Sequence, residues 1–88
     1  MKRVYDGIVY DSTSAAILAA QSHNARGVGL CQNHEGKFFL LFLSSWPGEP
    51  ESIHPIPNDE VGEQITWFER EGVCFVSRES ILASLPQA

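Results

Sequence analysis

Two cysteines and two histidines are the residues of this chain best suited to hold a metal ion. Cys31 and His34 stand in a C-x-x-H pattern, and Cys74 and His54 could complete a set of four ligands. Tetrahedral zinc requires all four side chains to converge on one point. The spacing matches no usual zinc ribbon or finger, and His34 falls in an expected turn. We therefore expect buried thiols and surface histidines in place of a metal site.

Catalysis by a cysteine nucleophile requires an adjacent base and a third group that orients that base. The sequence offers Cys31 and His34 nothing more than proximity along the chain. It contains no glycine-rich phosphate loop, no Ser-His-Asp pattern and no recognisable pair of catalytic carboxylates. We expect a non-enzymatic protein without a cofactor, and a small hydrolytic or metal-binding protein remains as one alternative.

The acidic residues of the chain are concentrated in one segment. The net charge is −5, and residues 49–71 hold seven acidic side chains against the single basic residue Arg70. A surface of this charge repels nucleic acid and attracts basic protein surfaces. The alternative is a solvated helix face that only keeps the protein soluble.

Two tryptophans accompany this acidic segment. Trp46 lies in a Pro-Gly loop and Trp67 lies on the acidic flank of an expected helix. Tryptophan is enriched among the residues that dominate binding energy at interfaces, although both rings could instead cover the edges of a small core. The predicted residues for binding a basic protein partner are Trp46, Glu49, Glu51, Asp59, Glu60, Glu63, Trp67 and Glu71.

Residues 72–85 bear a faint similarity to the recognition half of a helix-turn-helix, in which Gly-Val precedes Ser-Arg-Glu. The inserted Cys74-Phe75-Val76 interrupts the turn, Arg78 is the only basic residue, and the preceding helix is acidic. DNA binding requires several cations to neutralise phosphates. Nucleic acid is therefore a disfavoured partner, and a small autoregulatory transcription factor remains as the alternative function.

The expected elements are organised around an apolar run from Phe38 to Leu43. A glycine before it and Ser-Ser-Trp-Pro-Gly after it favour a strand over a buried helix. Side chains of a strand alternate between two faces. One face then holds Phe38, Leu40 and Phe42, and the other holds Phe39, Leu41 and Leu43. Because both faces are apolar, the strand should be central and covered on both sides.

The remaining elements follow from turn and capping signals. Asp6-Gly7 predicts a tight hairpin between residues 2–5 and 8–10, and Ala-rich residues 14–22 predict a helix. A strand is expected over 28–33 and an edge strand limited by prolines over 52–56. Asn58 is the expected N-cap of an acidic helix in which Val61, Ile65 and Phe68 share one face. Ser77 should cap a short last helix in which Ile81, Leu82 and Leu85 face inward.

These elements predict a single α+β domain over residues 1–88. The expected architecture is an antiparallel sheet of four or five strands, with two main helices on one face and a short C-terminal helix. An 88-residue chain then has too few helices to cover both faces of the sheet. We therefore expect the second face to be buried in a homodimer or by another partner.

The sequence also indicates the compartment. No apolar stretch follows the basic N-terminal residues, and no segment approaches the roughly 20 apolar residues of a membrane helix. Two cysteines are too few for a disulfide scaffold and fit reduced thiols. We expect a cytoplasmic protein that does not bind membranes.

Four segments carry a resemblance to a loosely defined group of small bacterial and phage-borne proteins. They are Lys2 to Thr13 (KRVYDGIVYDST), Gly36 to Leu40 (GKFFL), Ile56-Pro57, and Glu63 to Trp67 (EQITW). The sequence departs from this group at Trp46 to Glu51, where many members have a glycine-rich segment. Proteins of this size and charge on mobile elements include anti-CRISPR inhibitors. The resemblance therefore implies an inhibitor that acts through protein–protein contact.

Overall fold

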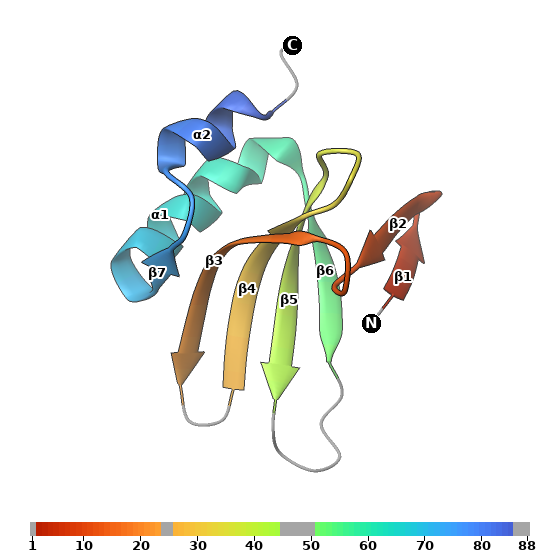
Figure 1. The fold of residues 1–88 in the computed structure, drawn as a ribbon, viewed down its shortest axis with the longest axis horizontal. Helices are drawn as coiled ribbons and strands as arrows, with labels where there is room; N and C mark the ends of the chain where they lie inside the picture. Colours follow the sequence, from red (N-terminus) through yellow and green to blue (C-terminus); the bar gives the residue numbers. More distant parts are fainter. Residues whose placement is uncertain (1, 24–25, 45–50, 86–88) are drawn as a thin grey trace.

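The computed structural model describes residues 2–23, 26–44 and 51–85, and Figure 1 shows their arrangement. The strands in chain order are β1 (Lys2–Tyr5), β2 (Ile8–Asp11), β3 (Ala16–His23), β4 (Arg26–Gln32), β5 (Phe38–Ser44), β6 (Ser52–Ile56) and β7 (Val73–Cys74). The helices are the 3₁₀ turn η1 (Asn58–Glu60), α1 (Val61–Glu71) and α2 (Arg78–Ala83). The α+β class predicted from the sequence is confirmed.

The main sheet has the strand order β6-β5-β4-β3-β7, and each neighbouring pair is antiparallel. The apolar run forms β5, which pairs with β4 on one side and β6 on the other, as expected for a central strand. β6 is an edge strand, as its Pro55 predicts, since proline has no N–H to donate to a further strand. The alternation in β5 is also confirmed, because Phe38 and Phe39 are buried in two different apolar clusters.

The first hairpin forms as its Asp-Gly turn predicts. Asp6 and Gly7 have φ of 49° and 75°, the positive values that a type I′ turn requires at both central positions. The hairpin does not join the main sheet but forms a separate two-stranded sheet of β1 and β2. It packs against the second face of the main sheet, where Tyr10 contacts Phe39 edge to face at 5.4 Å between ring centroids.

The helix expected over residues 14–22 is wrong, because this segment forms β3. Helix propensity favours alanine by less than about 1 kcal/mol per residue, and strand pairing with β4 along most of β3 outweighs it. The small residues serve close packing instead: Ala19 is fully buried beneath α1, and the carbonyl of Ala20 closely approaches Gly72. The carboxylate of Asp11 closes the turn before this strand by accepting the N–H of Thr13 at 2.9 Å.

The acidic helix is present, and Val61, Ile65 and Phe68 are each fully buried on one face, as predicted. Its start differs from the expectation. Asn58 does not cap α1, since residues 58–60 form η1 and no side chain caps either segment. The predicted N-cap of the last helix is confirmed, because the Ser77 hydroxyl accepts the N–H of Ser80.

In α2, Ile81 faces inward as expected and Leu85 packs against the core just beyond the helix. Leu82 does not face inward, because six helical residues can turn only one narrow face to the core, and its side chain is 37% exposed. Within residues 2–23, 26–44 and 51–85, no helix is long and apolar enough to cross a membrane.

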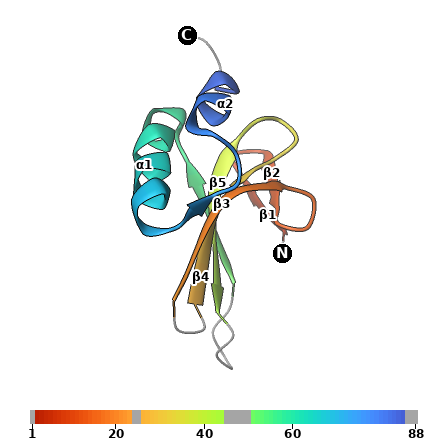
Figure 2. The ribbon, with the colours of Figure 1, turned by 60° about the vertical axis from the view of Figure 1, so that its left-hand side comes forward.

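The two apolar clusters lie on opposite faces of the main sheet. One is formed with α1 and α2, and the other with the β1–β2 hairpin, and Figure 2 shows these layers on the two sides of the sheet. The chain thus covers part of the second face by itself. The cover is incomplete on both faces, since Phe42 and Leu43 at the far end of β5 are 40% and 43% exposed. The expectation that another molecule must bury the whole second face therefore no longer follows.

Candidate functional site

A groove of about 400 Å³ opens where α1 passes over the sheet. Its floor consists of Val28 from β4 and of Leu40 and Phe42 from β5. Its wall comes from α1 and contains Trp67 and Phe68 together with the polar side chains Glu63 and Gln64. The groove therefore combines an apolar, aromatic interior with one negative charge at its lip.

Strand register explains why the floor is continuous. Val28 lies directly opposite Phe42 in the β4–β5 pair, and Leu40 is two residues earlier on the same face of β5. α1 covers the part of this face nearer to Phe38, while Phe42 remains 40% exposed. The ring of His54 packs edge to face on Phe42 with centroids 5.0 Å apart, which fixes the outer end of the floor.

The wall is set by helical periodicity. Trp67 precedes the buried Phe68 and lies on the flank of α1 rather than on its buried face, so its ring is half-buried. The two rings meet edge to face at 4.9 Å and 90°. Glu63 stands one turn before Trp67 on the same flank. Packing on Phe68 therefore holds the indole in place beside a carboxylate.

Acidic side chains extend beyond the groove along the same flank of the helix. Glu60 lies about two turns before Trp67 and Glu71 about one turn after it, and both side chains are exposed. Glu71 lies 3.5 Å from the neighbouring Arg70, an exposed ion pair that water largely screens. Negative charge on this flank is consequently offset only weakly within the helix.

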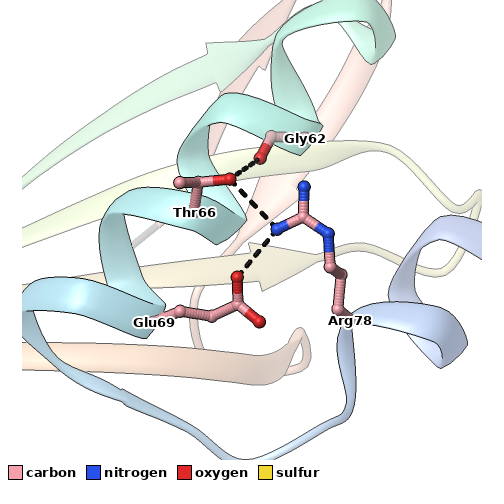
Figure 3. Close-up of polar contacts among 4 residues, drawn as sticks. All are labelled: Gly62, Thr66, Glu69 and Arg78. Carbon is pink, nitrogen blue, oxygen red and sulfur yellow. Dashed lines mark hydrogen bonds and ion pairs between the residues drawn. The ribbon is translucent and has the colours of Figure 1, made fainter.

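The opposite flank of α1 has different chemistry. The guanidinium of Arg78 donates to Glu69 at 2.7 Å and to the hydroxyl of Thr66 at 3.0 Å, and that hydroxyl donates to the carbonyl of Gly62 (Figure 3). These contacts join α2 to α1 and neutralise Glu69. The one basic residue that a helix-turn-helix interpretation could use is thus paired within the chain.

The metal and nucleophile candidates do not come together. Cys31 lies in the cluster beneath the hairpin, Cys74 packs against the opposite cluster, and His54 is stacked on Phe42. Across the described residues, which include all four candidates, no three side chains of the ligand-forming types are grouped to hold a metal. Burial raises the pKa of the Cys31 thiol to about 11 and also raises the pKa of Cys74, so both thiols are poor nucleophiles near neutral pH.

The residues predicted to bind a partner are brought together in part. Trp46 and Glu49 lie outside the described residues, and Glu51 is exposed just before β6. Asp59 is exposed in η1, ahead of the flank that carries Glu60, Glu63, Trp67 and Glu71. Comparison of the chain with protein-family models, curated proteins and solved structures finds no match. The groove itself therefore carries the functional argument.

Sequence reasoning missed the floor of the groove. The alternation in β5 places Leu40 and Phe42 on one face, and the sequence also predicts Val28 in the neighbouring strand. The missing information is the distance that α1 extends along the sheet. When residues 14–22 are assigned to a second helix, that helix covers the rest of the face and Phe42 has no reason to be exposed.

Proposed function

We propose that this protein is a non-enzymatic interaction module that binds a basic segment of a partner protein in the groove between α1 and the sheet. The proposal rests on one groove that combines the exposed ring of Phe42, the partly buried ring of Trp67 and the carboxylate of Glu63. An apolar groove with an acidic lip is complementary to side chains that have an apolar stem and a positive head.

Lysine and arginine have this shape. Their methylene stems can lie on Val28 and Leu40 while the charged head stays near water at the lip. There the head can pair with Glu63 and stack on the face of Trp67, and each of these contacts contributes on the order of 1 kcal/mol. The surrounding negative charge increases the rate of encounter with a basic partner.

The resemblance to mobile-element proteins suggests a biological role for such binding. An inhibitor with this surface occupies a basic site that otherwise receives nucleic-acid phosphate. The acidic flank of α1 then takes the place of the phosphates, and the groove supplies the apolar contacts that distinguish the target from other basic proteins. The proposal thus includes an anti-CRISPR-like mode of action through occupancy.

The binding step can be tested by fluorescence with a synthetic peptide of alternating lysine and leucine. Replacing Trp46 by Phe leaves Trp67 as the only tryptophan reporter. We expect the emission of Trp67 to change on titration, with an affinity that falls as salt rises because screening weakens exposed charge pairs. A peptide of alternating glutamate and leucine should not bind.

Charge reversal at the lip provides the decisive variant. Glu63→Lys should weaken peptide binding roughly tenfold or more, equivalent to about 1.4 kcal/mol. Glu35→Lys makes the same change in net charge at an exposed turn outside the groove and should leave binding within about twofold. Equal losses in both variants, or none in either, would remove the groove from the proposal.

Affinity capture from a bacterial lysate, followed by mass spectrometry, then identifies the natural partner. We expect the wild-type protein, but not Glu63→Lys, to retain a basic protein. A gel shift with the gene's own upstream DNA at low and high salt examines the transcription-factor alternative, and we expect no shift at either salt concentration.

A further inference from the structure

Arg26 is the only lysine, arginine, aspartate or glutamate in strands β3 to β6. It is the first residue of β4, where it pairs with Ser44 of β5, and its side chain is exposed. Val28, two residues further on, packs against the helix-side cluster and forms part of the groove floor. Because side chains alternate along a strand, Arg26 lies on the same face as Val28. The floor of the groove therefore leads to a positive charge.

The side chains on this face form rows across the sheet. The first row, beside α1, contains Leu40, which packs against the helix-side cluster. The second row contains Phe42 opposite Val28, and the third contains Arg26. Successive rows are about 6.7 Å apart, because each strand residue advances the chain by about 3.3 Å. Strands β4 and β5 extend beyond α1 toward the third row (Figure 2).

Opposite charges lie at the two ends of these rows. Glu63 lines the groove from α1, on the side of the first row, and Arg26 lies in the third row. A guanidinium has five N–H donors, so Arg26 can receive a partner's carboxylate while it keeps contacts within its own chain. A segment that crosses all three rows is therefore most complementary when it presents a basic, an apolar and an acidic side chain in that order.

An extended segment matches the spacing of the rows. Alternate side chains of an extended chain point the same way and are also about 6.7 Å apart. Three alternate residues of one extended segment can therefore meet the three rows in turn. Side chains on one face of a helix are about 5–6 Å apart and recur every three or four residues. A helix laid along the same path would fall out of step with the rows.

We propose, on the basis of the groove function above, that the partner segment is extended and alternates a basic, an apolar and an acidic residue with spacers. Its pattern is K-x-L-x-E or the reverse, since either chain direction presents the same order of side chains. The basic residue pairs with Glu63, the apolar residue lies on Phe42 and Val28, and the acidic residue pairs with Arg26. Arg26 thus discriminates this segment from a uniformly basic one.

Two capped peptides that differ at one position test this assignment. One contains Lys-Ser-Leu-Ser-Glu and the other Lys-Ser-Leu-Ser-Lys, each between Gly-Ser flanks, and Trp67 of the Trp46→Phe protein reports the titration. With Arg26 present, we expect the glutamate peptide to bind roughly fivefold more tightly, the size expected when an exposed charge pair changes from repulsive to attractive. Arg26→Glu should reverse the preference.

Matched variants separate the position of the charge from its amount. Arg26→Lys keeps the charge and should keep the preference for the glutamate peptide. Arg3→Glu makes the same change in net charge on the β1–β2 hairpin and should leave the preference within about twofold. A third peptide with helical spacing, Lys-Ala-Ala-Ala-Leu-Ala-Ala-Glu, should bind more weakly than the extended one. Circular dichroism establishes that each variant is folded.

A preference that Arg26→Glu leaves unchanged would overturn the proposal, as would tighter binding of the helical-spacing peptide. An apparent Kd that rises with protein concentration would show that a second copy occupies the groove, which also contradicts it. Glu63→Lys tests the groove separately. If it weakens both Lys-Ser-Leu peptides while Arg26→Glu changes no preference, the groove function stands and only the extended segment fails. If neither variant changes binding, both proposals fail.

Discussion

Replacing Gly72 by alanine is expected to destabilise the protein by about 2 kcal/mol or more. A Cβ at this position would lie 2.4 Å from the carbonyl oxygen of Ala20 and 3.0 Å from the Cβ of Gln21. The closest contact is with backbone, so no side-chain rotation can relieve it, and α1 would have to move away from β3. Thermal unfolding followed by circular dichroism should show a decrease in Tm of roughly 8 °C or more.

Gly62 provides the matched control for this substitution. A Cβ there meets nothing within 4 Å, and the residue lies in the first turn of α1. Gly62→Ala should therefore raise stability by about 0.5–1 kcal/mol, since alanine has the better helix propensity. The close approach of α1 to β3 would be refuted by a Gly72→Ala protein that unfolds within a degree or two of the wild type.

The second large effect is expected at Leu41, beneath the hairpin. Leu41 is 6% exposed in the cluster that contains Tyr10 and Phe39. Leu41→Ala should cost about 2–5 kcal/mol, because it removes buried methyl groups and leaves a cavity. Urea unfolding monitored by fluorescence gives the change in free energy of unfolding, with the slope of the transition expected to stay constant.

Leu43 is the control for this prediction because it is the same residue type on the same face of the same strand, two positions further on. It is 43% exposed, beyond the reach of the hairpin. Leu43→Ala should cost less than about 1 kcal/mol. Similar losses of stability at both positions would contradict the conclusion that the hairpin buries Leu41 and leaves Leu43 uncovered.

Local signals in the sequence predict the elements in which pattern and burial agree. The Asp6-Gly7 turn, the apolar β5 and the buried face of α1 all follow from turn chemistry or side-chain period. The helix prediction for residues 14–22 is wrong because alanine has a high helix propensity, whereas the role of these residues depends on the tertiary approach of α1 and Gly72. The sequence predicts only that Gly72 ends a helix, and no local pattern reveals its contact with β3.

The sequence predicts the helix wall of the groove but not its floor. The position of Trp67 beside Glu63 follows from helical spacing, and the structure places both at the groove. The floor requires knowledge of which strand end α1 leaves uncovered, and this is a property of the assembled fold. The exposure of Ile17 is hidden for the same reason, since its side chain can be assigned to a face of the sheet only once residues 16–23 are known to be a strand.

The most direct test of groove binding is an amide NMR titration of the labelled protein with the lysine–leucine peptide. Binding in the groove predicts that the largest shift changes occur at Val28, Phe42, Glu63 and Trp67, which line it, and that Val4 and Val73 remain unchanged. Shift changes centred on the hairpin and β7, or scattered evenly over the surface, would contradict a partner site between α1 and the sheet.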